Sequence, residues 1–450
     1  MKLTVVGAGG IRMPLFVRSL LRRIKRGTPV DVLAMTDIRD DHLTIMGQLA
    51  KHLAVEAGVD LRVEVEPDLE TALVGSHAVV TTIRPGFEDG RITDEGICTA
   101  VKILGQETVG AAGFAMGARS IPDLLAICRS ARKVCPDAII LNFTNPAGIV
   151  AQAMRDAGYD NVIGICDSAD TVKDYVALSY DIQPHRITTR VFGLNHLSAT
   201  MRVCVDGEDI TPKLMADDSF LERWFGIFGN DLVRELGAFP NEYLYYYLLP
   251  EQAVAGVLAE TETRGEKVKQ ITDRFFAGAA DPALAHDPTA LLQLHTACMS
   301  DRNASYMEYA WKDTDAKQRP DHHLAEGEGY AGVALDVIEA KWQEPKEIAL
   351  IVPSRGTVDC LAYHDVAEIT CRVDADGLTP IAPPFVPPRL EALVRELRVF
   401  ETLTVLASRH QNGRVAKWAL ASHPRVGLRS IVERVFEKFA AAHPVVRAMK

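Results

Sequence analysis

The N-terminal segment constrains the fold of this chain more than any other. An apolar strand pattern runs directly into a turn that contains Gly7, Gly9 and Gly10. A helical pattern over residues 14–26 and a second strand pattern over residues 30–36 follow the turn. This alternation predicts a parallel sheet with right-handed crossovers. A glycine turn between a strand and a helix can hold the pyrophosphate of a dinucleotide against backbone N–H groups.

The glycine turn does not complete the GxGxxG pattern, because Arg12 occupies the place of the third glycine. Asp37 supports the nucleotide interpretation, since it ends the second predicted strand. A carboxylate there can bind the ribose hydroxyls of NAD and disfavours the 2′-phosphate of NADP. Gly7, Gly9, Gly10 and Asp37 are therefore the candidate NAD ligands. The alternative for Asp37 is a turn or helix-cap aspartate.

The rest of the chain divides into two predicted domains. Further strand patterns extend the first unit to about residue 190, and we expect a Rossmann-type doubly wound NAD-binding domain over residues 1–190. We expect a mixed α/β domain for substrate binding and oligomerisation over residues 191–450. Its strand patterns flank long helical stretches, and a proline-rich bend at residues 380–388 leads into one long helical tail.

Composition excludes several classes of protein. The 450 residues are 48% hydrophobic and 24% charged, as in an ordinary globular chain. A formal net charge of -11 argues against nucleic acid or an anionic membrane as the main partner. No apolar run has the length of a membrane span, and the chain begins with a strand pattern rather than a signal peptide. The eight cysteines form no CxxC pair, so we expect a cytoplasmic protein with mostly buried thiols.

Reactive side chains gather where strands of the predicted sheet end. Asn145 lies in an NFTNPAG motif after one strand, Cys166 and Asp167 end the next, and a GLNH motif brings Asn195 and His196. Carboxyl ends of parallel strands form the ligand-binding edge of doubly wound folds. We therefore expect a thiol, a carboxylate and an imidazole at one site. The alternatives are a cysteine in the strand core and a hydrogen-bonded core histidine.

The ordered motifs of this chain resemble the NAD-dependent glycosidases of glycoside hydrolase family 4, which act as 6-phospho-α-glucosidases, 6-phospho-β-glucosidases and α-galactosidases. The resemblance covers nearly the whole chain. It rests on the loop GQETVGAAGF at residues 105–114, NFTNPAG, the strand that ends in cysteine, GLNH, PNEYLYY at residues 240–246, and TRGE at residues 263–266. It is far more specific than the glycine turn.

The resemblance implies the metal and nucleotide ligands. In that family a cysteine and a histidine bind a divalent metal, mostly manganese, together with two sugar hydroxyls, and these roles fall on Cys166 and His196. A thiolate and an imidazole leave coordination positions open for substrate oxygens. Asn195 is expected to orient the site or bind a hydroxyl. Asn145 is expected to contact both the cofactor and the substrate.

The resemblance also implies the reaction, which differs from the usual scheme with two carboxylates. NAD takes a hydride from C3 of the sugar, a base removes the proton at C2, and the aglycone leaves C1. Water then adds, and NADH returns the hydride. The base falls on Tyr243, with Tyr245, Tyr246 and Tyr247 as neighbours. The acid is Asp167.

The anomer and the group at C6 stay open. A Cys-Asp pair is typical of α-specific members and Cys-Asn of β-specific ones, whereas the tyrosine segment is closer to β-specific members. Arg84, Arg91 and Arg264 can clamp an anionic group, and the alternative is that each is a surface or salt-bridge residue. A segment EGEGY at residues 326–330 replaces Arg-Gly-Gly-x-Tyr and adds acids. The substrate is therefore a 6-phospho-α-glucoside by default, with a 6-sulfonate (sulfoquinovosyl) or a 6-carboxylate glycoside as alternatives.

Two other classes compete with a glycosidase. A lactate- or malate-type 2-hydroxy acid dehydrogenase shares the glycine turn and an Asn-Pro segment but uses no metal thiolate. A nucleotide-binding sensor without catalysis is the third possibility, which the clustered reactive groups disfavour. Members of the resembled family are dimers or tetramers, so we expect a homodimer or homotetramer.

Overall fold

The computed structural model of the chain describes residues 1–311 and 328–450. The strands are β1 (Lys2–Val6), β2 (Val32–Thr36), β3 (Arg62–Val65), β4 (Ser76–Thr81), β5 (Ile139–Asn142), β6 (Val162–Gly164), β7 (Ile187–Leu194), β8 (Leu197–Val205), β9 (Glu208–Asp209), β10 (Phe239–Pro240), β11 (Lys346–Pro353), β12 (Val366–Asp374) and β13 (Gly377–Pro380).

The first helices are α1 (Met13–Lys25), α2 (Asp40–Ala57), α3 (Leu69–Leu73), α4 (Phe87–Thr99), α5 (Gly110–Val134), α6 (Ala147–Asp156), α7 (Thr171–Tyr180), α8 (Thr211–Ala216), α9 (Asp218–Phe225) and α10 (Asn230–Leu236). The remaining helices are α11 (Tyr245–Leu248), α12 (Pro250–Ala259), α13 (Arg264–Ala280), α14 (Pro288–Ala304), α15 (Gly329–Trp342), α16 (Pro388–His410), α17 (Gly413–Ser422), α18 (Arg429–Ala442) and α19 (Pro444–Arg447).

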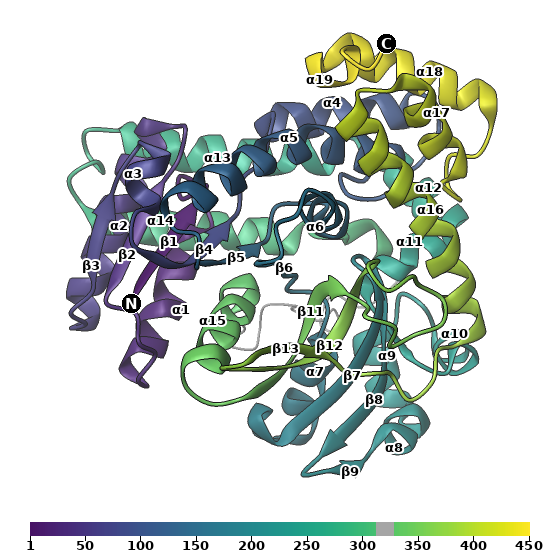
Figure 1. Cartoon of the computed structure of the whole chain (residues 1–450), viewed down its shortest axis with the longest axis horizontal. Coiled ribbons are helices and arrows are strands. Elements are labelled where there is room, and N and C mark those ends of the chain that lie inside the picture. The colour runs from purple at the N-terminus through teal and green to yellow at the C-terminus, as the bar shows by residue number, and fades with distance from the viewer. Residues whose placement is uncertain (312–327) are drawn as a thin grey trace.

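One mixed sheet joins the 13 described strands (Figure 1). Its N-terminal half has the order β3-β2-β1-β4-β5-β6, and all of these strands are parallel. This is the strand order of dinucleotide-binding sheets. The order of the strands along the chain reverses between β1 and β4, while the strands stay parallel. The predicted Rossmann-type sheet is confirmed.

The C-terminal half continues the same sheet with antiparallel strands. β11 pairs with β6 where Ile351 faces Gly164, and β12, β7, β8 and β10 extend the sheet outward. The mixed α/β character of this half is confirmed. Because the sheet is continuous across residue 190, the boundary placed there stays a prediction.

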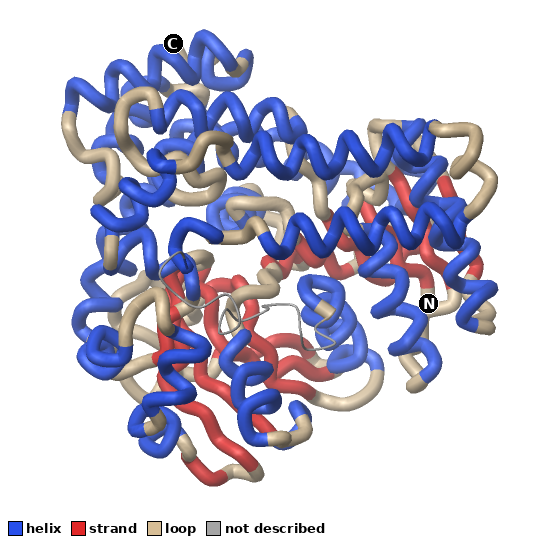
Figure 2. The backbone as a smooth tube through the Cα atoms, turned by 180° about the vertical axis from the view of Figure 1, so that it is seen from behind, coloured by secondary structure: helices blue, strands red, loops and turns tan. Residues whose placement is uncertain are grey.

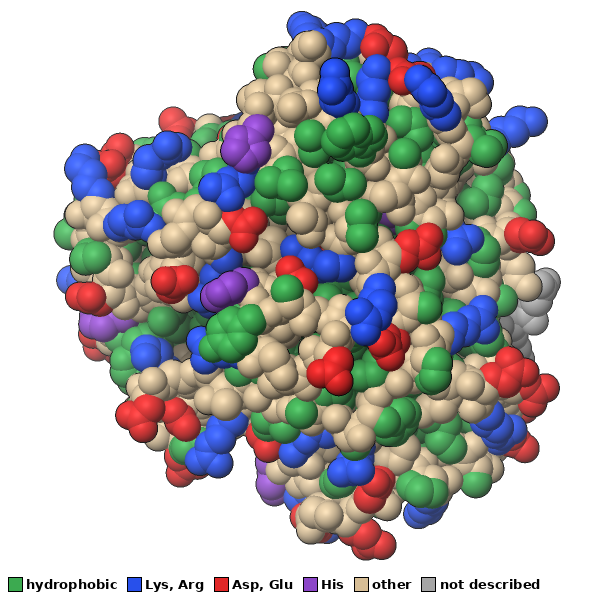
Figure 3. All heavy atoms as spheres, turned by 45° about the vertical axis from the view of Figure 1, so that its right-hand side comes forward, with side chains coloured by type: hydrophobic (Ala, Val, Ile, Leu, Met, Phe, Trp, Pro, Cys, Tyr) green, Lys and Arg blue, Asp and Glu red, His purple; other side chains and the backbone are tan. Residues whose placement is uncertain are grey.

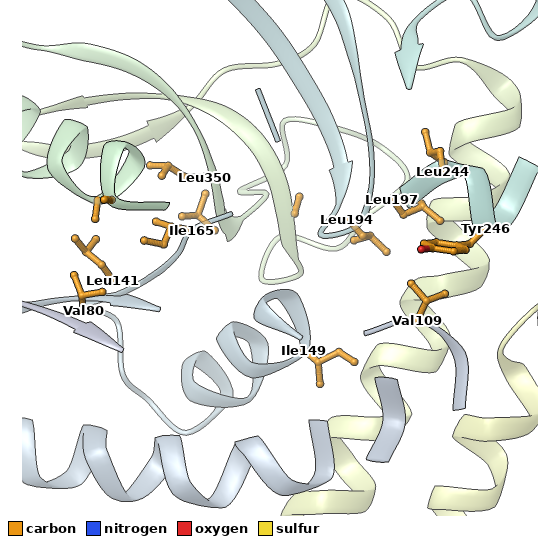
Figure 4. Packing of buried hydrophobic residues seen from close by; sticks show 14 of the residues in the cluster. Val80, Val109, Leu141, Ile149, Ile165, Leu194, Leu197, Leu244, Tyr246 and Leu350 are labelled. Carbon is orange, nitrogen blue, oxygen red and sulfur yellow. The ribbon is translucent and has the colours of Figure 1, made fainter. Parts of the chain in front are cut away.

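Helices cover both faces of the sheet. α1 and α15 pack together on one face, and α5 and α6 lie on the other (Figure 1). Figure 2 shows the same layers from behind. Apolar side chains from neighbouring strands fill the core, as Val80, Leu141 and Leu350 do in Figure 4. Among the described residues, α5 alone is long and apolar enough to cross a membrane, and 78% of its apolar window is buried inside the protein.

Two predictions about helices are wrong. The residues from 110 to 114 were expected in a glycine-rich loop, but α5 begins at Gly110, because the small residues there form its fully buried first turns. The tail after residue 388 was expected to be one long helix, but it forms four helices, α16 to α19. Gln411 has a left-handed backbone (φ 48°), and the side chain of Asn412 accepts the N–H groups of Arg414 and Val415 to start α17.

Candidate active site

The glycine turn after β1 lies at the reversal point of the sheet. The N–H groups of Gly7 and Ala8 donate to the carbonyl oxygen of Thr36, at 2.9 and 3.1 Å. Gly7 has φ 95°, and a Cβ atom there would lie 2.5 Å from the backbone oxygen of Thr82 in the loop after β4. Only glycine fits this position. Gly10 is exposed at the mouth of the turn.

Asp37 fixes the shape of the same turn. Its Oδ2 accepts the N–H of Gly9 at 2.8 Å, and its Oδ1 accepts the N–H of Arg39 at 3.0 Å. The carboxylate thus lies at the carboxyl end of β2, beside the glycine turn, where dinucleotide-binding sheets place their ribose ligand.

Cys166 and His196 lie side by side, although 30 positions separate them. Cys166 follows β6, and His196 occupies the tight turn between β7 and β8 with φ 62°. The Sγ of Cys166 is 3.7 Å from the Nε2 of His196, and both residues are buried. In the described part of the chain no third Cys, His, Asp or Glu completes a metal-binding group. The pair supplies two ligands and leaves the rest of a coordination sphere open.

Two neighbours orient the imidazole of His196. The hydroxyl of Thr108 lies 2.8 Å from Nδ1, so Nε2 faces the thiol. The ring of Tyr243 stacks on the imidazole, with centroids 3.7 Å apart and planes 2° from parallel. Leu194 and Leu197 flank the histidine turn and pack into the core near Tyr246 (Figure 4).

Burial keeps both candidate metal ligands neutral in the structure. It lowers the pKa of His196 to about 4, against the opposing effect of Asp167 and Glu107. An imidazole that is neutral at neutral pH is the form that binds a metal. Burial, then the charges of Glu368 and Asp167, raise the pKa of the Cys166 thiol well above its usual value. A cation between the two groups would favour the thiolate.

The two predicted asparagines differ in their surroundings. The side chain of Asn195 is buried and bonded inside the protein: Nδ2 donates to Glu368 at 3.1 Å, and Oδ1 accepts the N–H of Gly148 at 3.4 Å. The side chain of Asn145 has no hydrogen bond to a described residue and is half-buried. Asn145 is thus the better placed to bind a ligand, and the substrate roles of both residues stay predictions.

Only one of the four tyrosines lies against the imidazole. Tyr243 is in contact with His196, while Tyr246 bonds the hydroxyl of Tyr309 at 2.9 Å. Tyr245 and Tyr247 are buried in the core. Burial and the nearby Glu242 raise the pKa of Tyr243 well above its usual value. The hydroxyl of Tyr306 donates to Glu242 at 3.2 Å, so a carboxylate and two phenols lie together here.

Asp167 pairs with a residue of the glycine turn. Its Oδ2 lies 3.0 Å from the Nη2 of Arg12, and both side chains are about three-tenths exposed. Arg12 also lies over the ring of Phe143 at 5.6 Å. The arginine that replaces the third glycine therefore joins the nucleotide turn to the candidate acid.

Arginines from distant segments converge beside this pair. Arg84 and Arg91 both pair with Glu107, and Arg91 also pairs with Glu95 at 2.7 Å. Arg264 donates to Ser305 and to the carbonyl oxygen of Arg302. Burial and the charge of Arg91 lower the pKa of Arg264 to about 10.

Arg302 was not predicted, although it lies in the same group. Burial, followed by the charges of Arg264 and Arg12, lowers its pKa well below the usual value. Neither Arg302 nor Arg264 forms an ion pair with any residue in the ranges 1–311 and 328–450. A hollow of about 60 Å³ is lined by Arg91 and Arg264 together.

Glu328 of the EGEGY segment does not add an uncompensated negative charge beside the group of arginines. Glu328 pairs with Arg23 at 2.6 Å and with Arg22 at 3.5 Å, both on α1. Its charge is therefore compensated on the other side of the segment. The first acid of the predicted motif, Glu326, lies outside the described residues.

Several residues that build the site were missed in the sequence. They are Arg12, Glu107, Thr108, Glu242, Arg302, Tyr306 and Glu368. Glu107 and Thr108 belong to the GQET motif, and this motif was the only feature of the sequence that could have identified them as site residues. Glu368 is fully buried on β12, where it accepts hydrogen bonds from Asn195 and Ser198, and burial raises its pKa to about 7. The feature of the sequence that could have identified Glu368 is a lone acidic residue within an apolar strand pattern.

The fold and the site define an α/β enzyme with a thiol–imidazole pair at the ligand-binding edge of a dinucleotide-type sheet. Residues 2–182 match the model of the family 4 glycosyl hydrolases, and residues 191–426 match the model of their C-terminal domain. The chain belongs to glycosyl hydrolase family 4. It is therefore a glycoside hydrolase, and the alternative of a 2-hydroxy acid dehydrogenase is not favoured.

Relatives of both anomeric specificities resemble the chain equally. It is 26% identical over 457 residues to a "Probable 6-phospho-beta-glucosidase" of Bacillus subtilis, covering 98% of this chain and 96% of that protein. It is also 26% identical over 427 residues to "6-phospho-alpha-glucosidase 1" of Lacticaseibacillus paracasei, covering 91% and 89%. The solved 6-phospho-beta glucosidase of Thermotoga maritima, with manganese, NAD+ and glucose-6-phosphate, shares the fold with a TM-score of 0.81 at 24% identity over 98% of each chain.

Proposed function

We propose that the chain is an NAD- and divalent-metal-dependent glycosidase that acts on glucosides with a phosphate at C6. The observation that carries this proposal is the excess of positive charge beside Cys166 and His196. Five arginines (12, 84, 91, 264 and 302) converge there, and among the described residues only Asp167, Glu95 and Glu107 pair with them. Arg264 and Arg302 are partly buried and have no carboxylate partner among the described residues, so an anion would stabilise both guanidinium groups.

The charge of that anion favours a phosphate. A phosphomonoester carries about -1.5 to -2 charges at neutral pH, which matches Arg264 and Arg302 together. A sulfonate or a carboxylate carries one negative charge and would leave one guanidinium uncompensated. The ion pairs of Glu328 with Arg22 and Arg23 compensate one of the two acids that argued against a dianion. A 6-phosphate is therefore the leading substituent, and the sulfoquinovosyl alternative is weaker.

The residues present suit both cofactors. Gly7, Gly9 and Gly10 form the backbone cradle for NAD, with Asp37 beside it. Cys166 and the neutral imidazole of His196 are the donors that would hold manganese or a similar ion. When bound, NAD accepts a hydride from C3 and returns it at the end of the cycle, and the metal polarises the oxygen at C3.

The protein side chains divide the proton transfers. Tyr243, stacked on His196, is the base for the proton at C2, and a metal cation held beside it by Cys166 and His196 would favour the phenolate against the opposing effects of burial and Glu242. Asp167 gives a proton to the leaving oxygen, held in place by Arg12. Asn145, with its amide uncommitted, binds sugar hydroxyls or the cofactor. Asp167 favours an α-linked substrate, in line with the typical Cys-Asp pair.

A panel of nitrophenyl glucosides tests this proposal. It contains α and β anomers with a hydroxyl, phosphate, sulfonate or carboxylate at C6, and each is assayed with NAD and manganese. We expect release of nitrophenol from the 6-phospho-α-glucoside and none after Cys166→Ser. Turnover that prefers the unphosphorylated glucoside, or that survives Cys166→Ser, would show the proposal to be wrong. A cytoplasmic location and a dimeric or tetrameric assembly remain proposals. Cell fractionation tests the location, and gel filtration tests the assembly.

A further inference from the structure

A second hollow lies away from the candidate active site. It has a volume of about 220 Å³ and lies between the first residue of β5, the residues around the start of β6, and the α15, β11 and β12–β13 segments. Cys166 follows the other end of β6, so the hollow and the thiol lie at opposite ends of one strand. Figure 1 shows α15 beside β11 and β13.

Three cations line this hollow, and each keeps unused hydrogen-bond donors. Arg155 donates from Nη2 to the carbonyl oxygen of Val162 at 2.6 Å, but its buried Nε has no partner in the described structure. The guanidinium of Arg355 donates to the carbonyl oxygen of Leu378 at 2.9 Å and to no other described residue. Lys341 forms no ion pair with a described residue.

The acids at the hollow do not balance these charges. Asp160 is 3.8 Å from the Nη1 of Arg155, too far for a hydrogen bond, and its side chain is 92% exposed. Asp374 already accepts the backbone N–H groups of residues 376 and 377 in the hairpin turn. Burial lowers the pKa of Arg155, the charge of Asp160 opposes this effect, and the charge of Arg355 adds to it, so Arg355 lies close enough for the two guanidinium groups to repel each other.

We propose that this hollow is a binding site for a small phosphorylated metabolite. Guanidinium groups with spare N–H donors bind phosphate oxygens in pairs, and an anion between Arg155 and Arg355 would replace their repulsion by attraction. The unpartnered N–H of Arg155 would be compensated as well. A volume of about 220 Å³ is below that of pockets for drug-sized ligands, which suits a phosphate with a short carbon chain. The site is separate from the proposed glycoside site and does not depend on it.

Calorimetric titration with inorganic phosphate and with glycerol 3-phosphate tests the site on the full chain. The candidate active site also holds arginines, so we expect two classes of sites. Arg355→Gln combined with Lys341→Gln removes one class, or weakens it by about tenfold or more, and leaves glycosidase activity unchanged. Arg302→Gln removes the other class. Arg355→Lys should restore part of the binding, and Arg223→Gln, an exposed arginine elsewhere, should change neither class.

Soaking crystals in tungstate locates the anion directly, because tungsten scatters anomalously. The proposal requires a tungstate peak between Arg155 and Arg355 that Arg355→Gln abolishes. A peak at the active-site arginines alone, or phosphate binding that the double substitution leaves intact, would overturn it. Both variants change side chains that are at least partly exposed, and circular dichroism verifies that they fold.

Discussion

The hydroxyl of Thr108 determines which nitrogen of His196 faces Cys166. It lies 2.8 Å from Nδ1 and can accept the proton of that nitrogen, which leaves the lone pair of Nε2 toward the thiol. Partners of this kind fix the tautomer of a metal-binding histidine. Thr108→Val keeps the shape and removes the hydrogen bond.

We expect Thr108→Val to weaken manganese binding by about 10- to 100-fold. Titration of the metal, followed by electron paramagnetic resonance, measures this affinity. Thr44→Val is the matched control, since Thr44 is exposed on α2 and its hydroxyl donates to the backbone oxygen of Asp40. Equal affinities of Thr108→Val and wild type would show that the hydroxyl does not orient the ligand.

Arg302 carries the charge for which no described carboxylate compensates. Arg302→Gln should raise KM for a 6-phosphoglucoside by about tenfold or more, because it removes a charge-assisted hydrogen bond. The kcat value should change less, since the phosphate is remote from the reacting carbons. Steady-state kinetics separates the two effects, with exposed Arg129→Gln as the control. A loss confined to kcat would contradict binding of the phosphate by Arg302.

At the scale of elements, His423 joins the end of α17 to the start of α5. Its Nε2 lies 3.2 Å from the N–H of Gly110, and burial lowers its pKa to about 3. The folded chain therefore keeps this imidazole neutral at pH values where the unfolded chain binds a proton. The contribution of His423 to the free energy of unfolding is therefore fully present above pH 6.5 and is lost progressively as the pH decreases toward 3.

His423→Gln should reduce the loss of unfolding free energy between pH 7 and pH 5 by about 2 kcal/mol. Urea unfolding at the two pH values measures this difference. The exposed His410→Gln provides the matched control. If both variants keep the pH dependence of the wild type, His423 does not supply the linkage.

Gly413 fixes the contact between α17 and the C-terminal end. Its N–H donates to the carbonyl oxygen of Met449 at 2.7 Å, and a Cβ atom would lie 2.6 Å from that oxygen. Gly413→Ala should cost about 1–3 kcal/mol of stability through this clash. Gly96→Ala, where no atom lies within 4 Å, should be neutral or stabilising. Thermal unfolding compares the two variants, and equal melting temperatures would argue against the contact.

The elements that the sequence predicts well are those with local patterns. The β1 turn, β2 and β5 followed from apolar runs that end in glycine or polar residues, and Cys166 was expected at an edge because it follows such a run. The break at Gln411 was missed, because the residue in the left-handed conformation is a glutamine rather than the glycine that usually marks a helix end. The first turns of α5 were missed because alanine and glycine alternate there without a polar face.

At the scale of the whole molecule, the topology explains why the rest of the site was not predictable. The C-terminal strands β11 and β12 lie between β6 and β7, so Cys166 and His196 meet across a hairpin from residues 346–374. This insertion brings Glu368 within hydrogen-bond distance of the side chain of Asn195. Arg12 and Asp167 are likewise 155 positions apart. Cys166 and His196 were expected at one site from the ordered motifs, but no pattern within one segment predicts the Glu368–Asn195 and Arg12–Asp167 contacts.

One face of the molecule carries side chains of mixed charge. On the face in Figure 3, acidic, basic and apolar side chains are interspersed. The concentrated positive charge of this acidic chain, with its net charge of -11, lies instead at the buried arginines of the candidate site. Binding of an anionic substrate is therefore a property of the site and not of the surface.

The proposed enzyme breaks the glycosidic bond by oxidation and elimination rather than with two carboxylates. Hydrolysis of a 6-phosphoglucoside in D2O, with NAD and manganese, tests it most directly. Because a base removes the C2 proton and solvent returns it, we expect NMR to show glucose 6-phosphate with deuterium at C2, without net formation of NADH. Product that keeps hydrogen at C2, or NADH formed in equal amount to product, would contradict it.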